Sequence, residues 1–429
     1  MLVLPQIVLA SAQEGLTLCD EAGTLTQNTD GSLYYSSDLR YGADLSELTV
    51  WMNRLNDVFR DDGKVLVVVP TPLRGMVNGS VVNDAAALEE LEIDFDFGES
   101  QAYYHDYVSS LEPIVAVDLL DAATSLNGQT PGYHLKLDRH WTPEGAQVSA
   151  QAVAQVLSAS SEYNALQLPK RTIFSTVRVG EQSSPEKIFE LIGENCGDLP
   201  DELMETMSLY ETERDTEQTL FDSEQPYVTL AGGSFSGKKY NFAGFLSEAL
   251  GQDVVDNSVS GGGLFIPLQD YLLNTPPESR AEVIIWEYRM TDATSTNNKE
   301  DFTPFRELIP AVYGACSAEK TLLLNSTEVS ATNFTVLENS SDSSVQGEDY
   351  YLHLQASDLS LVEFEIAMTH EDGSVDTAPI ERSTRVSNTG EYFLELSRDI
   401  ASPLREVSLT LPDGVTGTVD ARLCKVPGA

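Results

Sequence analysis

Hydrophobic positions in the first 316 residues follow two alternating patterns. Continuous apolar runs, each of the length of a buried parallel strand, occur at residues 64–70, 227–231 and 283–286. Apolar positions with helical spacing occur at residues 45–59, 143–157, 241–250 and 267–273. Thr142 and Pro143 add a helix start signal to the second of these segments. Strands that alternate with helices predict an α/β fold with a doubly wound parallel sheet.

The pattern changes near residue 317. Short, often alternating apolar runs are separated there by turn residues, at 322–324, 350–354, 361–367, 391–396 and 406–411. This pattern is typical of an all-β sandwich. We therefore expect an α/β domain over residues 13–316 and a β-sandwich domain over residues 317–429. The acidic, turn-rich residues 183–224 predict a helical excursion or a surface insertion.

The N-terminus has features of a signal peptide. Residues 1–12 are apolar and close with Ala10, Ser11 and Ala12, which fits the small-residue cleavage rule, although a basic start is missing. We expect these residues to be the remnant of a signal peptide and the mature chain to begin near Gln13. A short buried strand is the alternative.

The cysteines indicate an oxidising compartment. Cys19, Cys196, Cys316 and Cys424 contain no C-x-x-C pair, which disfavours a zinc ribbon or thioredoxin chemistry. An even number behind a signal-like segment favours two disulfides. Of the three pairings we favour Cys19–Cys196 and Cys316–Cys424, because the second would join the two ends of the β domain. Four free buried cysteines are the alternative.

The amino-acid composition limits the kinds of molecule that the protein can bind. The chain has 429 residues, with 25 Lys and Arg against 68 Asp and Glu, so its net charge is −43. Such a field repels nucleic acids and anionic lipid surfaces. The apolar fraction of 41% is still enough for sizeable cores. No run approaches 18 uncharged apolar residues, so we expect no transmembrane helix.

The first candidate for chemistry is the turn GGSFSG at residues 232–237, between a predicted strand and a predicted helix. A serine at the carboxyl end of a parallel strand is exposed at the sheet edge, where nearby backbone N–H groups can hold an oxyanion. Ser234 is therefore a candidate nucleophile, with an ordinary turn as the alternative. The turn also matches most of a P-loop, but Lys239 replaces the Ser or Thr that binds Mg²⁺, which disfavours a nucleotide.

The second candidate is the segment LDRHWTPEG at residues 137–145. On an extended segment, Asp138 and His140 would point to the same face because they are two residues apart. A carboxylate beside an imidazole is what the base of a serine nucleophile requires. The alternative is a surface histidine before a capped helix.

Two further segments follow strand-like runs. The loop SGGG at residues 260–263 comes after Val254 and Val255, and Gly261 is our candidate for a second oxyanion N–H. Tyr288 and Arg289 follow the run at 283–286 and are candidate substrate contacts, because ligands gather at the carboxyl ends of strands. The alternatives are a flexible glycine loop and packing in the core.

Together these segments resemble a known family. The serine turn, the segment around His140, NFAGFL at 241–246, WEY at 286–288, VPTP at 69–72 and SDLR at 37–40 are similar to the AlgX family of alginate O-acetyltransferases. The resemblance implies an SGNH-hydrolase-like domain, a carbohydrate-binding β sandwich and a periplasmic location. It also implies that Ser234, His140 and Asp138 are catalytic, with no metal or other cofactor.

The implied reaction moves an acetyl group from a donor to Ser234 and then to a mannuronate hydroxyl of alginate. The implied partners are that polymer and other alginate acetylation and export proteins. A polysaccharide acetyl esterase with the same triad and a non-catalytic alginate-binding assembly factor are the alternatives.

Local positive charge must hold a polyanion on this acidic chain, because charges are screened beyond a Debye length of about 8 Å at physiological salt. Near the motifs we expect a positive lip formed by Lys136, Arg139, Lys238, Lys239 and Arg289. In the β domain, Arg382 and Arg385 are candidate polymer contacts, since Arg binds carboxylates in a bidentate manner. Ordinary solvation or pairing with neighbouring acids is the alternative.

Overall fold

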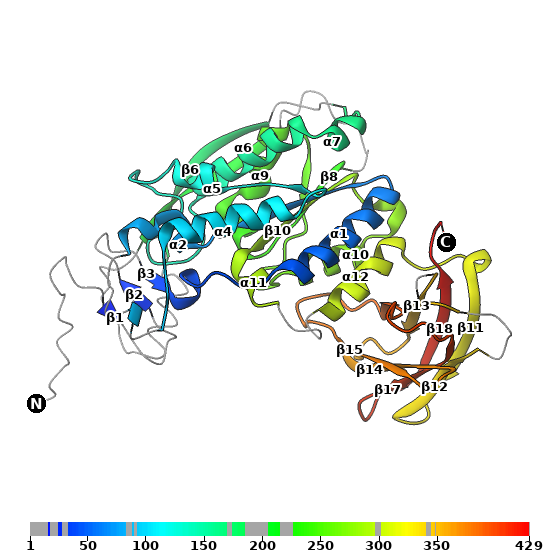
Figure 1. The fold of residues 1–429 in the computed structure, drawn as a ribbon. Helices are drawn as coiled ribbons and strands as arrows, with labels where there is room; N and C mark the ends of the chain where they lie inside the picture. Colours follow the sequence, from blue (N-terminus) through cyan, green and yellow to red (C-terminus); the bar gives the residue numbers. More distant parts are fainter. Residues whose placement is uncertain are drawn as a thin grey trace, which may run out of the picture.

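The computed structural model describes residues 16–17, 25–27, 33–82, 88–89, 92–169, 174–184, 205–214, 226–296, 302–339, 345–347 and 349–428. They form an α/β domain and a C-terminal β domain that lie side by side (Figure 1). The predicted signal-peptide remnant and the predicted pair Cys19–Cys196 lie outside the described residues.

A five-stranded parallel sheet forms the centre of the α/β domain, in the order β5-β4-β10-β8-β9. The strands are β4 (Val65–Thr71), β5 (Val115–Ala116), β8 (Val228–Ala231), β9 (Val254–Asp256) and β10 (Val283–Arg289). All of β4 and β8 is buried, which explains their continuous apolar runs. The predicted α/β fold with a parallel sheet is confirmed.

Helices lie on both sides of this sheet (Figure 1). On one side pack α1 (Ser46–Asp61), α10 (Ile266–Asn274) and α12 (Thr303–Tyr313). On the other pack α5 (Leu120–Thr124), α6 (Pro143–Ala159) and α9 (Phe242–Leu250). As predicted, α6 begins at Pro143, and the Thr142 side chain caps it by accepting a hydrogen bond from the Gly145 N–H. The other α-helices are α2 (Arg74–Asn78), α4 (Phe97–Ser110), α7 (Ser161–Ala165) and α11 (Met290–Thr294).

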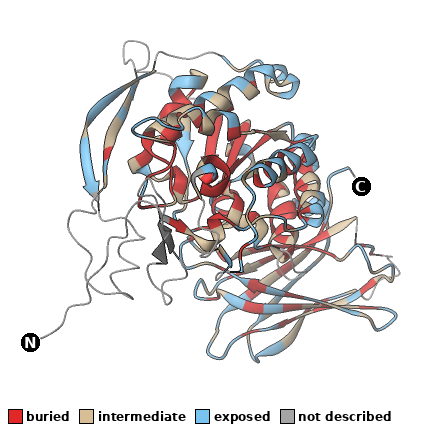
Figure 2. Ribbon diagram, turned by 60° about the vertical axis from the view of Figure 1, so that its left-hand side comes forward, coloured by how far each residue is buried: buried red, intermediate tan, exposed pale blue. Residues whose placement is uncertain are grey.

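Two smaller β elements flank the domain. Short strands β1 (Leu16–Thr17), β2 (Leu25–Gln27) and β3 (Leu33–Tyr35) form an antiparallel sheet near the N-terminus. Strands β6 (Phe174–Ser184) and β7 (Glu205–Arg214) form a hairpin that packs on α9. The hairpin is largely exposed or intermediate in burial (Figure 2). Of the two predictions for residues 183–224, the helical excursion is wrong for the described residues 183–184 and 205–214, which pair as strands, whereas a surface insertion agrees with the exposure of the hairpin.

The C-terminal domain is a sandwich of two antiparallel four-stranded sheets, in the orders β11-β18-β13-β16 and β12-β17-β14-β15. Leu352, Ile366, Val407 and Leu423 are among the residues of its core. This confirms the predicted all-β sandwich. The strands are β11 (Thr321–Glu328), β12 (Asn333–Glu338), β13 (Tyr350–Ala356), β14 (Glu363–His370), β15 (Val375–Glu381), β16 (Glu391–Glu395), β17 (Leu404–Thr410) and β18 (Thr418–Lys425).

A covalent link and a packed helix join the two domains. The disulfide Cys316–Cys424 connects the segment after α12 to β18, as the sequence predicted. Helix α12 packs on β16, and the Tyr351 hydroxyl donates a hydrogen bond to the Gly314 carbonyl at 2.9 Å. The C-terminal domain is therefore held in a fixed position on the α/β domain.

Candidate active site

Asp138, His140 and Ser234 form a continuous hydrogen-bonded chain. The His140 Nδ1 atom lies 2.8 and 2.9 Å from the two carboxylate oxygens of Asp138, and its Nε2 atom lies 2.7 Å from the Ser234 Oγ atom. Asp138 and His140 are buried, whereas Ser234 is partly exposed. The hydroxyl can thus meet a substrate while its base is shielded from water.

A tight bend places the first two of these side chains. The Leu135 N–H donates to the His140 carbonyl at 3.0 Å, the Thr142 N–H donates to the Tyr133 carbonyl at 2.8 Å, and His134 pairs with Trp141. Asp138 lies at the tip of this fold-back. The segment is bent and not extended, because the chain reverses direction between residues 133 and 142, and the bend brings Asp138 and His140 together.

Two charged side chains from other parts of the chain hold the bend through hydrogen bonds to its backbone. The buried guanidinium of Arg74 donates to the carbonyl oxygens of Lys136 and Asp138, each at 3.0 Å. The carboxylate of Glu205, at the start of β7, accepts hydrogen bonds from the Lys136 and Leu137 N–H groups at 2.8 and 3.0 Å. The hairpin therefore braces the backbone next to Asp138. Sequence reasoning missed both residues, because nothing near them in sequence marks these long-range contacts.

Aromatic side chains enclose the imidazole. The Tyr240 ring stacks on His140 at a centroid distance of 5.4 Å, and the Phe235 ring lies at 4.8 Å. The Trp141 indole N–H donates to the Phe235 carbonyl at 2.7 Å. These contacts join the His140 bend to the serine turn and restrict the imidazole to one orientation.

A buried carboxylate lies beneath the serine turn. Glu287, on β10, accepts hydrogen bonds from the Gly233 N–H and the Ser236 hydroxyl, both at 2.8 Å. Burial raises the pKa of Glu287 to about 7, although these two hydrogen bonds lower it. A Cβ atom on Gly232 would lie 2.1 Å from the Ser236 Oγ atom, so this position requires glycine. The sequence analysis did not predict Glu287 as a residue of the site.

The glycine loop after β9 runs beside the serine turn. The Asn257 N–H donates to the Leu230 carbonyl, and the Val259 N–H donates to the Gly232 carbonyl at 2.9 Å. Gly261 follows with φ +75°, a conformation that favours glycine. The predicted second donor is thus on the segment next to Ser234.

The predicted substrate contacts fall into different environments. Tyr288 is fully buried, and its hydroxyl lies 2.7 Å from that of Tyr107. The prediction of Tyr288 as a substrate contact is therefore wrong, because its ring is buried in the core of the α/β domain. Arg289 is half-buried and pairs with Asp292.

Of the other predicted lip residues, Arg139 lies 3.7 Å over the Tyr35 ring, and Lys239 lies 4.9 Å over the Tyr240 ring. Lys136 and Lys238 are exposed. Lys239 and Arg139 therefore lie over aromatic rings next to the site.

The two predicted polymer contacts also differ. Only 2% of the Arg382 side chain is exposed, and it pairs with Glu307 of α12 at 3.3 Å. A polymer cannot reach it there, which corrects this prediction. Arg385 is exposed, and its Nη1 atom donates to the Ser260 carbonyl at 3.0 Å. It therefore reaches the glycine loop of the other domain.

The described residues show no group of three His, Cys, Asp or Glu side chains arranged to hold a metal ion. In the same part of the chain, no helix has the length and apolar character needed to cross a membrane. The arrangement that remains is a serine hydroxyl, a shielded imidazole and an orienting carboxylate, which can carry an acyl group through a covalent intermediate.

Comparison with known proteins places this arrangement in context. Residues 25–290 match the family described as SGNH hydrolase-like domain, acetyltransferase AlgX, and residues 315–429 match a C-terminal carbohydrate-binding module. The alginate biosynthesis protein AlgX of Pseudomonas fluorescens is 28% identical over 389 residues, which cover 87% of this chain and 77% of that protein. A protein named "Probable alginate O-acetylase AlgJ" from Pseudomonas putida is 30% identical over 45% of this chain and 51% of its own length.

Solved structures agree. The structure of Pseudomonas aeruginosa AlgX superposes with a TM-score of 0.80 at 27% identity, covering 96% of this chain and all of that one. The O-acetyltransferase domain of Pseudomonas putida AlgJ shares the fold, with a TM-score of 0.52 at 21% identity over 67% of this chain and 99% of its own. The chain belongs to the AlgX family of SGNH hydrolase-like acetyltransferases.

Proposed function

We propose that this protein transfers acetyl groups onto mannuronate hydroxyls of alginate through an acetyl-serine intermediate. The observation that carries the proposal is the continuous relay from Asp138 through His140 to the Ser234 hydroxyl, with contacts of 2.7 to 2.9 Å. Membership of the acetyltransferase family supports the reaction class, and the names of its relatives support alginate as the polymer.

The first half of the reaction acetylates the enzyme. The His140 Nε2 atom takes the Ser234 proton while the Oγ atom attacks the acetyl carbonyl of the donor. Negative charge then develops on the carbonyl oxygen, and we propose that backbone N–H groups of the serine turn and of Gly261 receive it. When this intermediate collapses, the leaving group takes the proton from His140 and acetyl-Ser234 remains.

The second half repeats these steps with the sugar as nucleophile. His140 removes the proton of a mannuronate hydroxyl, whose oxygen attacks acetyl-Ser234, and Ser234 recovers a proton from His140 as it leaves. Asp138 keeps the imidazole in the tautomer whose Nε2 accepts, and it stabilises the imidazolium that forms twice. An esterase would differ only in that water attacks the acetyl-serine.

The site must hold an anionic polymer on a chain of net charge −43. We propose that Lys136, Lys238 and Arg139 supply the nearby positive charge, since the first two are exposed and the third adjoins His140. We also propose that the protein acts in the periplasm, together with other proteins of alginate acetylation and export. The family and the predicted signal segment support this part of the proposal.

The decisive experiment uses a chromogenic acetyl ester as donor and unacetylated mannuronate oligomers as acceptor, with mass spectrometry of the oligomers. We expect acetylated oligomers from the wild type and none from Ser234→Ala. The control Ser158→Ala, on the exposed face of α6, should behave as wild type. Free acetate alone would identify an esterase. More than about a tenth of the wild-type rate in Ser234→Ala would exclude Ser234 as the nucleophile.

A further inference from the structure

One loop of the C-terminal domain docks on the α/β domain beside the serine turn. This docking loop, residues 382–387, is part of the connection from β15 to β16. The buried Arg382 guanidinium pairs with Glu307 of α12 at 3.3 Å, and the backbone of Ser387 lies near the Asp270 carboxylate on α10. The Arg382 end of the loop is therefore fixed by a group of the other domain, and the Ser387 end lies close to that domain.

Arg385 lies between Arg382 and Ser387 in sequence and reaches the glycine loop. Its Nη1 atom donates a hydrogen bond to the Ser260 carbonyl oxygen at 3.0 Å. Its guanidinium also covers Gly261, because a Cβ atom built on that residue would lie 3.1 Å from the Arg385 Cζ atom. The absence of a side chain at Gly261 is thus what permits the contact.

The atom that Arg385 binds belongs to a particular peptide group. The carbonyl of Ser260 and the N–H of Gly261 are the two ends of one planar amide. A cationic donor on the oxygen draws electron density from the amide and makes its N–H a stronger donor, because hydrogen bonds in series polarise one another. The hydrogen bond from Val259 to Gly232 keeps this amide close to the turn that carries Ser234.

We propose that Arg385 is a positioning residue of the α/β active site, which fixes and polarises the Ser260–Gly261 amide as an oxyanion donor. The C-terminal domain then completes the acyl-transfer site, in addition to any capture of polymer. This inference rests on the proposed function, because the oxyanion forms only when Ser234 attacks an acetyl group.

The test compares Arg385→Ala and Arg385→Lys with the wild type on a small chromogenic acetyl ester, which is too short to span both domains. We expect kcat to fall about tenfold in Arg385→Ala with KM nearly unchanged, and Arg385→Lys to recover part of the loss through its single charged donor. The control Arg405→Ala removes an exposed arginine of the same domain, paired with Glu406, and should leave kcat unchanged. Thermal melting establishes that each variant is folded.

Hydrogen exchange supplies a readout that does not depend on turnover. The amides of residues 260–263 should exchange faster in Arg385→Ala than in the wild type or in Arg405→Ala. Unchanged kcat, or unchanged exchange at these amides, would overturn the inference. A loss confined to affinity for long mannuronate chains would make Arg385 a polymer contact instead. If Ser234→Ala keeps full turnover, the proposed function fails, and the exchange experiment still decides whether Arg385 fixes the loop.

Discussion

Two histidines of the α/β domain offer a matched comparison. His140 and His105 each place Nδ1 against a carboxylate, that of Asp138 at 2.8 Å and that of Asp118 at 2.5 Å. Only His140 has a serine hydroxyl at Nε2 among the described contacts, and His105 is exposed. We expect His140→Ala to reduce acetyl-ester turnover by several orders of magnitude and Asp138→Asn by about 10⁴-fold, whereas His105→Ala keeps the wild-type rate. Steady-state kinetics of the three variants tests this, and a severe effect of His105→Ala would contradict the assignment.

The buried carboxyl of Glu287 predicts a pH effect on stability. Its pKa rises from 4.5 to about 7 on folding because burial disfavours the charged form. The folded state therefore retains a proton that the unfolded state releases, and the free energy of unfolding falls as the pH rises from 4.5 to 7. Urea unfolding across this range should show a shallower fall for Glu287→Gln than for the wild type.

A second carboxyl provides the comparison for that experiment. Burial also raises the pKa of Glu307 to about 7 and outweighs the attraction of Arg382. Glu307→Gln should flatten the same pH range, but it should leave acetyl-ester kcat closer to the wild type, since Glu287 and not Glu307 supports the serine turn. Equal pH slopes in the wild type and both variants would refute the role of burial.

At the scale of elements, the sequence predicted the helices and strands that bury one continuous apolar surface. Strands β4, β8 and β10 and the capped start of α6 lie where the pattern placed them. Strand β15 was missed because only Ala378 and Ile380 of its seven residues are buried. The hairpin β6–β7 was missed because its pairing joins distant segments, and local pattern carries no information about such pairing.

The residues of the site likewise divide into those that a local motif reveals and those that only long-range contacts reveal. The three relay residues sit in short motifs whose chemistry can be read locally. Arg74, Glu205 and Glu287 act through contacts between elements far apart in sequence. Gly233 and Glu287, for example, are 54 positions apart. The environments of Tyr288 and Arg382 were mispredicted for the same reason, because burial depends on the partner element.

Glu205 gives the hairpin a testable role. Each of its carboxylate oxygens accepts one backbone N–H next to Asp138. In Glu205→Gln one acceptor becomes a donor that faces an N–H, so we expect kcat to fall about tenfold while the folded state persists. Glu211→Gln, an exposed change on the same strand, is the control. Kinetics together with thermal melting tests this, and equal rates for the two variants would contradict it.

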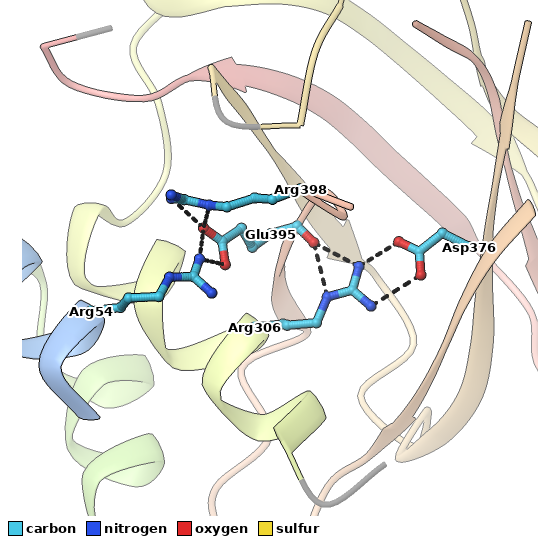
Figure 3. Close-up of polar contacts among 5 residues, drawn as sticks. All are labelled: Arg54, Arg306, Asp376, Glu395 and Arg398. Carbon is cyan, nitrogen blue, oxygen red and sulfur yellow. Dashed lines mark hydrogen bonds and ion pairs between the residues drawn. The ribbon is translucent and has the colours of Figure 1, made fainter. Parts of the chain in front are cut away.

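At the scale of the whole molecule, a charged cluster fastens the two domains together (Figure 3). Arg54 of α1 and Arg398 both contact the Glu395 carboxylate, at 2.5 and 2.8 Å. Arg306 of α12 binds the Asp376 carboxylate through two nitrogens and also donates to the Glu395 carbonyl. The cluster lines an interdomain cavity of about 390 Å³. Each arginine of the cluster already has a carboxylate partner within the protein. We therefore interpret the cluster as a contact that joins the two domains.

Removing the central acid should loosen this contact. Only 7% of the Glu395 side chain is exposed, so Glu395→Ala leaves two arginines without their shared partner. We expect the free energy of unfolding to fall by about 1–3 kcal/mol, more at low salt than at high salt. Glu406→Ala, which removes an exposed pair with Arg405, should cost at most about 1 kcal/mol. Urea unfolding at two salt concentrations measures both, and equal losses would contradict the role of burial.

The disulfide between Cys316 and Cys424 makes the C-terminal domain a covalent ring. The two cysteines are 108 positions apart, and the ring contains nearly every strand of the sandwich. A protease that cuts one peptide bond inside the ring therefore cannot release either piece. The nicked protein should run at full size on a non-reducing gel and separate into two fragments only after reduction. Until then the last strand, β18, stays tethered between β11 and β13, and the docking loop keeps its place beside the serine turn.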